Sequence, residues 1–443
     1  MMAELRRKFY DWLVQWKSTR HNECLLIKGA RQIGKTFIVE KFGHEQYDNF
    51  IELNFVLNPD ACSIFDGSLL ADDLYRKLTA FDATCRLVPG RTLIFLDEIQ
   101  ECANARTALK SFAQDGRYDV IASGSLLGIK YKNKKSRQRH VPRSIPVGFE
   151  RQVVMHSLDL EEFLWARGVT DEAIDVLKGY YSRRESVPDA VNRKYEGLVR
   201  EYLIVGGMPA VVKAYVESGN FSSVQGEQEK IIASYVDDIH KYADTTDIPK
   251  IEACYRAIPR LLARENRKFK YAEVEKGGSE RKYAASVDWL CDASFALRAV
   301  NAKNAHVPLN AQVRDGWFKL YLSDVGLLSA LYGPETKGLL YSGRLVGNAK
   351  GGIYENLIAG ELARKGRPLF YLKNEDGTRE VEFAFERDGG VVPVEVKSSN
   401  GATISLNEAL ANPNVPCGYK FIDGNVGVAG KKITLPHYMA MFL

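Results

Sequence analysis

Short apolar runs that lead into small or polar residues recur in the first third of the chain. Three of them are residues 24–27 (CLLI), 92–96 (TLIFL) and 120–122 (VIA). Runs of this length are typical of buried strands. Residues 36–42 carry apolar side chains at helical spacing, and Gly43 ends that pattern. The alternation of strand and helix predicts an α/β domain built on a parallel sheet.

The C-terminal half begins with a different pattern. Apolar residues recur at helical spacing between 258 and 291, and residues 296–300 are typical of a strand. Helices followed by a small hairpin favour a winged helix-turn-helix. Arg281 and Lys282 lie near the start of the predicted second helix, where a DNA-reading helix presents its side chains. Contact with DNA and internal packing are equally compatible with this position.

The last hundred residues predict a helix followed by a hairpin. Residues 351–358 indicate the start of the helix, and residues 379–385 and 391–397 indicate two strands. The sequence Asp-Gly-Gly at 388–390 is a turn signal between these strands.

Charged residues on these predicted elements form a candidate metal site. Glu395 and Lys397 point to the same face of their strand, and Glu382 can lie across the hairpin from them. Paired carboxylates can hold Mg²⁺, while a lysine stabilises a developing phosphate anion or orients water. The alternative is a charged strand edge. The candidate residues are Glu355, Glu382, Glu395 and Lys397.

Composition narrows the class of protein. The chain has 443 residues and a net charge of +5, so its length predicts about three domains. Its seven cysteines include no CxxC pair, which indicates reduced thiols and a cytoplasmic location. The first residues contain no apolar stretch typical of a secretion signal, and no uncharged run is long enough to cross a membrane.

The stretch GARQIGKT, residues 29–36, fits the pattern GxxxxGK[ST] between a predicted strand and a predicted helix. Such a loop directs backbone N–H groups at phosphate oxygens. Lys35 would reach the β- and γ-phosphates of ATP, and Thr36 would hold Mg²⁺. The alternative is a glycine turn before an ordinary helix. The predicted nucleotide-binding residues are Gly29, Ala30, Arg31, Gln32, Ile33, Gly34, Lys35, Thr36 and Phe37, with Ser123 discussed below.

A P-loop needs a second acidic site at the end of a neighbouring strand. The run TLIFL ends in Asp97 and Glu98. Asp97 is predicted to bind Mg²⁺ together with Thr36, and Glu98 to polarise the attacking water as a catalytic residue with Lys35. Ser123 follows the third strand and is a candidate sensor of the γ-phosphate, although Ser-Gly-Ser is also a common turn.

Five segments together resemble a prokaryotic AAA-type ATPase family with an uncharacterised C-terminal domain. They are GARQIGKT, LIFLDEIQEC, YDVIASGSLLG, SIPVGFE and LDLEEFLWA, and the match runs through essentially the whole chain. The resemblance implies an α/β fold with four parts. These are a P-loop AAA-type ATPase core with a parallel sheet at 1–160, a helical connector at 161–245, a winged-helix-like domain at 246–335 and a C-terminal α/β restriction-endonuclease-like domain at 336–443.

The C-terminal acids resemble the PD-(D/E)xK nuclease superfamily. Glu355 matches its helical acid, and Glu395, Val396 and Lys397 match its ExK signature. Glu382 stands where that superfamily usually has aspartate, and its extra methylene changes the distance to a metal. The fold is therefore compatible with a nuclease or with a relative that only binds.

Basic residues give two further expectations. Enzymes of this type usually receive an arginine from a neighbouring subunit, which implies a homo-oligomer; the candidates are Arg106, Arg117, Arg143 and Arg151. Residues 130–143 contain seven cations and no acid. This run is compatible with a solvated loop or with a nucleic-acid contact that depends on salt.

The sequence thus predicts an ATP- and Mg²⁺-binding ATPase whose C-terminal half engages nucleic acid, DNA in the first place. Whether that half cuts nucleic acid stays open. The alternative is a nucleotide-dependent protein-interaction switch with a catalytically inactive nuclease-like domain. A small-molecule kinase is disfavoured, because it needs neither the Asp-Glu pair nor so long a C-terminal half.

Overall fold

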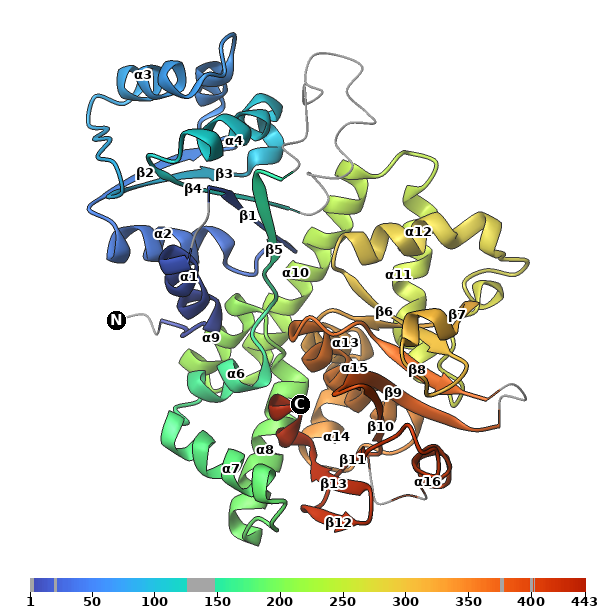
Figure 1. Cartoon of the computed structure of the whole chain (residues 1–443). Helices are drawn as coiled ribbons and strands as arrows, with labels where there is room; N and C mark the ends of the chain where they lie inside the picture. The colour runs from blue at the N-terminus through green and yellow to red at the C-terminus, as the bar shows by residue number, and fades with distance from the viewer. Residues whose placement is uncertain (1–3, 20–21, 126–147, 375–377, 399–400, 402) are drawn as a thin grey trace.

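The computed structural model describes residues 4–19, 22–125, 148–374, 378–398, 401 and 403–443. The basic run at 130–143, including Arg143, lies outside the described residues. Figure 1 shows the chain beginning in one α/β unit and ending in a second one, with helices between them. In the described part, no helix is long and apolar enough to cross a membrane.

The first unit is a five-stranded parallel sheet with the strand order β2-β3-β4-β1-β5. The three predicted strands are present as β1, β3 and β4, so the parallel core is confirmed. The strands are β1 (Cys24–Gly29), β2 (Asn49–Asn54), β3 (Thr92–Asp97), β4 (Asp119–Ser125) and β5 (Glu150–Val154).

Helices cover both faces of this sheet, because its central strands are apolar on both sides. Leu25 and Ile27 pack on the side of α1 and α2, while Leu26, Ile94 and Leu96 pack on the side of α3 and α4. The helices are α1 (Lys8–Thr19), α2 (Lys35–Gln46), α3 (Ala71–Phe81) and α4 (Ala103–Asp115), with short 3₁₀ turns at Pro59–Phe65 and Ile99–Glu101.

A helical region follows the first unit and continues beyond the helical connector expected at 161–245. Its longest member, α10, lies between the first sheet and the C-terminal half (Figure 1). The helices are α6 (Leu160–Ala166), α7 (Asp171–Arg183), α8 (Asp189–Val205), α9 (Pro209–Ser218), α10 (Phe221–Tyr242), α11 (Ile248–Leu262) and α12 (Glu280–Asp292), and a 3₁₀ turn spans Tyr271–Glu273.

The second sheet has eight strands in the order β12-β13-β11-β10-β9-β8-β6-β7. The hairpin β6–β7 follows α11 and α12, but β6 pairs in parallel with β8. The predicted wing is therefore an edge of the C-terminal sheet, and the winged helix stays a prediction. The strands are β6 (Ala296–Ala302), β7 (Val313–Leu322), β8 (Phe370–Lys373), β9 (Glu380–Arg387), β10 (Gly390–Val396), β11 (Gly418–Ile422), β12 (Gly427–Ala429) and β13 (Lys432–Pro436).

The predicted C-terminal hairpin is β9 paired antiparallel with β10. Asp388 and Gly389 form its turn with φ values of 51° and 75°, a left-handed conformation that aspartate and glycine adopt readily. The remaining helices are α13 (Val325–Tyr332), α14 (Pro334–Tyr341), α15 (Asn348–Arg364) and α16 (Ile404–Leu410), with 3₁₀ turns at Leu309–Gln312 and His437–Phe442. The helix predicted at 351–358 is part of α15.

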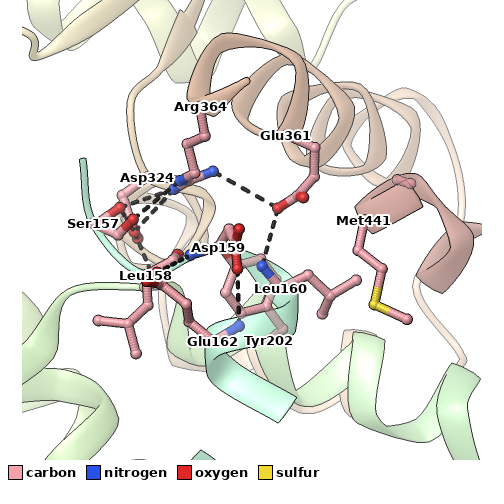
Figure 2. A network of polar contacts seen from close by, with 12 residues as sticks. Ser157, Leu158, Asp159, Leu160, Glu162, Tyr202, Asp324, Glu361, Arg364 and Met441 are labelled. Atoms are coloured by element: carbon pink, nitrogen blue, oxygen red, sulfur yellow. Dashed lines mark hydrogen bonds and ion pairs between the residues drawn. The ribbon is translucent and has the colours of Figure 1, made fainter. Parts of the chain in front are cut away.

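A buried polar network joins the end of the first unit to the C-terminal half (Figure 2). Arg364 of α15 donates to the Ser157 hydroxyl at 2.8 Å, and Ser157 donates to Asp324 at 3.0 Å. One turn earlier on α15, Glu361 accepts the backbone N–H of Leu160 at 3.0 Å. One continuous apolar cluster also runs from α1 to the C-terminal residue. The two units are thus packed on a shared core.

Candidate nucleotide-binding site

The glycine-rich loop joins the end of β1 to the start of α2. Gly34 has a φ of 89° and Gln32 a φ of 62°, so the loop turns through left-handed conformations that favour glycine. A Cβ on Gly29 would lie 2.5 Å from the backbone oxygen of Met155. Glycine is therefore needed where the loop passes the adjoining chain.

Lys35 opens α2 and folds back over this loop. Its ammonium donates to the backbone oxygen of Ala30 at 2.9 Å and of Gly29 at 3.3 Å, and the residue is only 7% exposed. Burial lowers the pKa of Lys35, while Glu98 and Asp97 act in the opposite direction. A further anion beside the ammonium would stabilise its charged form.

Asp97, at the end of β3, is hydrogen-bonded to residues of the loop and of the neighbouring strand β4. The Thr36 hydroxyl donates to its Oδ2 at 2.9 Å, and the Ser123 hydroxyl donates to its Oδ1. These contacts follow from the topology, because β3 lies between β2 and β4 and the carboxyl ends of parallel strands meet at one edge. The structure thus brings together Thr36, Asp97 and Ser123, which sequence analysis selected.

Asn54 is a further member of this group that sequence analysis missed. Its Nδ2 donates to Asp97 Oδ2 at 2.9 Å, and its Oδ1 accepts the N–H groups of Val56 and Leu57. Asn54 is paired directly with Asp97 in the β2–β3 register. A polar residue at the end of the edge strand was the available signal, but β2 was not among the predicted strands.

Glu98 is half-buried and has a left-handed φ of 54°. A non-glycine residue in this region costs roughly 1 kcal/mol or more and is found most often where function requires a particular side-chain direction. Gln100 donates to one of its carboxylate oxygens. Glu98 is therefore held at the strand end next to Asp97 by both backbone and side chain.

Side chains from outside the first sheet also hold the loop. Arg7, which is buried, donates to the backbone oxygen of Ile33 at 3.0 Å and pairs with Glu162 at 3.1 Å. On the other side, Arg31 pairs with Asp238 of α10 at 3.0 Å. The roles of Arg7 and Asp238 could not be predicted from the sequence, because neither residue belongs to a motif of the loop.

A pocket of about 390 Å³ opens beside the loop. Its lining combines apolar side chains with charged ones. Pro209 contributes from the start of α9, so the helical region forms part of the wall. The lining residues are Glu4, Leu5, Arg7, Gly34, Phe37, Ile38, Pro209 and Lys213.

The C-terminal candidate residues also lie together. Lys397 contacts Glu382 at 3.0 Å and Glu395 at 3.3 Å. Burial raises the pKa of Glu382 to about 7 against the effect of Lys397, and Glu355 is one of the charges acting on it. The predicted strand geometry therefore holds for these residues.

Protein cations neutralise the acids of this cluster. Arg267 donates to Glu355 at 2.8 Å, and the fully buried Lys319 lies 3.6 Å from the same carboxylate. Lys319 also pairs with Glu380 at 2.5 Å. Burial alone would raise the pKa of Glu380, but Lys319 and Lys373 hold it at about 2. Within the described residues, no three His, Cys, Asp or Glu side chains are grouped so as to hold a metal ion.

Three of the four candidate arginines have carboxylate partners in the first unit. Arg106 pairs with Glu150 at 3.0 Å, Arg117 with Asp115 at 2.8 Å, and Arg151 lies 3.7 Å from Glu23. The fourth, Arg143, is outside the described residues.

Comparison with protein families assigns the first unit. A model described as an AAA domain matches residues 21–164, and two models for domains of unknown function match residues 196–338 and 350–433. A comparison with curated proteins gives no match. Together with the loop geometry, the AAA match supports a P-loop AAA-type ATPase domain over residues 21–164. The nuclease-like character of the C-terminal segment stays a prediction.

The solved structures that match share little sequence with this chain. A Walker-type ATPase of Pyrococcus abyssi is 14% identical over 74% of this chain and 96% of its own, with a TM-score of 0.44. A RuvB variant of Thermotoga maritima is 14% identical over 68% and 88%, with a TM-score of 0.28. A STAND-class signal-transduction ATPase with a tetratricopeptide repeat sensor, from Pyrococcus horikoshii, is 12% identical over 82% and 46%, also at 0.28. These identities and TM-scores are too low to support a conclusion about the fold or the function of this chain.

Proposed function

We propose that the loop between β1 and α2 binds ATP with Mg²⁺ and that the protein hydrolyses it. The observation that carries this proposal is the 2.9 Å hydrogen bond between Thr36 and Asp97, which joins the loop to the acidic strand end. Hydroxyl and carboxylate oxygens are the ligands that Mg²⁺ prefers. Thr36 and Asp97 would hold the ion, which supplies positive charge beside the phosphates.

The protein groups then have separate tasks. The loop amides and Lys35 bind the phosphate oxygens, and Ser123 keeps Asp97 oriented through its hydroxyl. Glu98 accepts a proton from the water that attacks the γ-phosphorus. The bond from that phosphorus to the bridging oxygen breaks, and ADP and inorganic phosphate leave.

The pocket beside the loop would take the nucleoside base. Its volume of about 390 Å³ suits an aromatic ring system, and Leu5, Phe37 and Pro209 provide apolar contacts. Since Pro209 belongs to α9, base binding would bring the helical region and the ATPase domain into one site.

The binding step is tested by titrating the protein with Mg·ATP. Lys35→Ala removes the buried ammonium and should weaken ATP binding at least about 10-fold. Arg256→Ala is a matched control, because Arg256 is an exposed α11 residue that forms an ion pair with Glu252 of the same helix. Equal affinity in wild type and Lys35→Ala would contradict the proposal.

For the C-terminal half we infer a catalytically inactive module that responds to the nucleotide state of the ATPase domain. Arg267 and Lys319 already supply positive charge beside Glu355 and Glu380, so a divalent ion would have to compete with two covalently tethered cations. The alternative in which this half cuts nucleic acid is less well supported by these contacts.

A second candidate function, nucleic-acid binding without cleavage, is favoured by a basic cluster near the β6–β7 hairpin. Lys268 lies 3.6 Å and Arg314 4.1 Å from the ring centre of Trp317. Burial lowers the pKa of Lys268, and the nearby cations Arg314 and Lys270 lower it further. Concentrated positive charge of this kind suits a phosphate backbone.

One assay separates these functions. We expect wild type to leave labelled single- and double-stranded DNA uncut in Mg²⁺ and in Mn²⁺. If the second candidate is right, DNA binding at low salt should weaken at least about 10-fold in the double variant Lys268→Glu/Arg314→Glu. Cleavage that disappears in Glu395→Ala and Lys397→Ala would contradict the inactive module.

A further inference from the structure

Arg31 is a P-loop side chain shared between the nucleotide site and α10. Its Nε lies 3.0 Å from Asp238 Oδ1, and its Nη2 donates to the Tyr242 hydroxyl at 3.0 Å. Asp238 is almost completely buried, whereas about a third of the Arg31 side chain is exposed. The buried carboxylate thus fixes the direction of a guanidinium that still reaches open space.

These contacts leave hydrogen-bonding capacity on Arg31. A guanidinium has five N–H donors in a rigid fork, and the contacts with Asp238 and Tyr242 engage only part of them. The remaining donors suit a second anion with several oxygens, such as a phosphoryl group.

The guanidinium also interacts electrostatically with charged groups of the predicted nucleotide site. Burial opposes the charge of Arg31, but Asp238, Tyr242 and Glu98 together raise its pKa. Arg31 in turn is one of the charges that lower the pKa of Lys35. Arg31 therefore lies within electrostatic reach of the lysine assigned to the phosphates and of the glutamate assigned to the attacking water.

Three of the four arginines that the sequence offered as candidates for this role are engaged elsewhere in the described structure. Arg106, Arg117 and Arg151 face Glu150, Asp115 and Glu23, respectively. None of these carboxylates belongs to the loop or to the group around Asp97.

We propose that Arg31 contacts the γ-phosphate of ATP bound to its own chain and stabilises the negative charge that develops there during hydrolysis. Asp238 and Tyr242 are its positioning residues. This inference rests on the proposed ATP hydrolysis, and it makes α10 a direct neighbour of the reacting group. Phosphoryl transfer depends on such positioned cations.

The test compares Arg31→Gln and Arg31→Lys with wild type and with the control Arg256→Ala. We expect Arg31→Gln to bind ADP within about threefold of wild type, because the ADP phosphates are held by the loop and Lys35. Its kcat should fall at least about 100-fold, and Arg31→Lys should recover part of that loss. The complex of ADP with aluminium fluoride, which mimics the transferring phosphoryl group, should bind tightly to wild type and the control only.

The positioning role has its own readout. Asp238→Asn removes the charge that orients the guanidinium and should lower kcat about 10-fold while KM changes less than threefold. An Asp238→Asn variant with unchanged kcat would contradict the positioning role of this carboxylate.

Mixing distinguishes action within one chain from action between chains. A mixture of Arg31→Gln and Lys35→Ala proteins should stay inactive, because each active site lacks one of its own residues. Recovery of hydrolysis in the mixture would overturn the inference, as would tight aluminium fluoride binding by Arg31→Gln. A wild-type protein that neither binds nor hydrolyses ATP would instead contradict the proposed ATPase function on which this inference rests.

Discussion

Asp97 is the residue on which the candidate site converges. Thr36, Ser123 and Asn54 all donate hydrogen bonds to its carboxylate, and the residue is 1% exposed. Three donors satisfy the hydrogen-bonding capacity that a buried carboxylate would otherwise leave unused. A cation at this position would replace some of these hydrogen bonds with stronger electrostatic contacts.

A second carboxylate at Asn54 tests whether a cation binds here. In Asn54→Asp, two carboxylates would face each other across the present 2.9 Å contact and repel. We expect a lower unfolding temperature without Mg²⁺ and a larger rise in that temperature on adding Mg²⁺ than wild type shows. Asn58→Asp, in the exposed segment that follows β2, is the control. Equal Mg²⁺ effects in both variants would contradict a cation site at Asp97.

At the scale of elements, α10 connects two parts of the molecule. Near its C-terminal end, Asp238 and Tyr242 contact Arg31 of the P-loop. Near its middle, Tyr235 stacks on Phe295 with ring centres 4.0 Å apart, and Gln228 donates to backbone oxygens of α8 and α13. A change at the P-loop would therefore reach the C-terminal half through one helix.

The stability contribution of Asp238 should depend on pH. Burial raises its pKa from 3.8 to about 6, despite the opposing charge of Arg31. Because the folded-state pKa is the higher one, the folded protein binds more protons between these values, and stability is lost as pH rises through them. The stability difference between wild type and Asp238→Asn should shift against wild type by about 2 kcal/mol from pH 4 to pH 6. The unfolding free energies of both proteins are measured with denaturant across this pH range. Profiles that run parallel for wild type and Asp238→Asn would contradict the raised pKa of Asp238.

Local patterns could be predicted well from the sequence. The P-loop between β1 and α2 and the β9–β10 hairpin depend on adjacent residues, so the motif and turn signals sufficed. Partners from distant elements could not be predicted, because nothing in the loop sequence points to Asp238. For the same reason the sequence indicated an open acidic site at Glu355 but gave no sign that Arg267 and Lys319 would neutralise it.

On the scale of the whole molecule, the two α/β units share a buried interface. Arg364 lies among Ser157, Asp324 and Glu361, and every one of these groups is nearly inaccessible to water (Figure 2). A charged group in such a place stabilises only while all its partners remain in position. The C-terminal half is therefore a structural part of the molecule rather than a loosely attached domain.

Removal of this arginine should weaken both units together. Arg364→Met keeps the side-chain length but leaves Asp324 and Glu361 buried without their counterion. We expect a loss of about 3–5 kcal/mol in unfolding free energy, with denaturant transitions of both units shifted to the same extent. Arg256→Ala should change stability by less than about 0.5 kcal/mol. Independent unfolding, with only the C-terminal half affected, would contradict the shared interface.

The measurement that tests the central claim most directly is phosphate release from Mg·ATP by wild type, Lys35→Ala and Glu98→Gln. We predict Mg²⁺-dependent turnover by wild type, loss of both ATP binding and turnover in Lys35→Ala, and normal ATP binding without turnover in Glu98→Gln. A wild-type chain that releases no phosphate, or a Glu98→Gln protein as active as wild type, would contradict the assignment of this site as an ATPase.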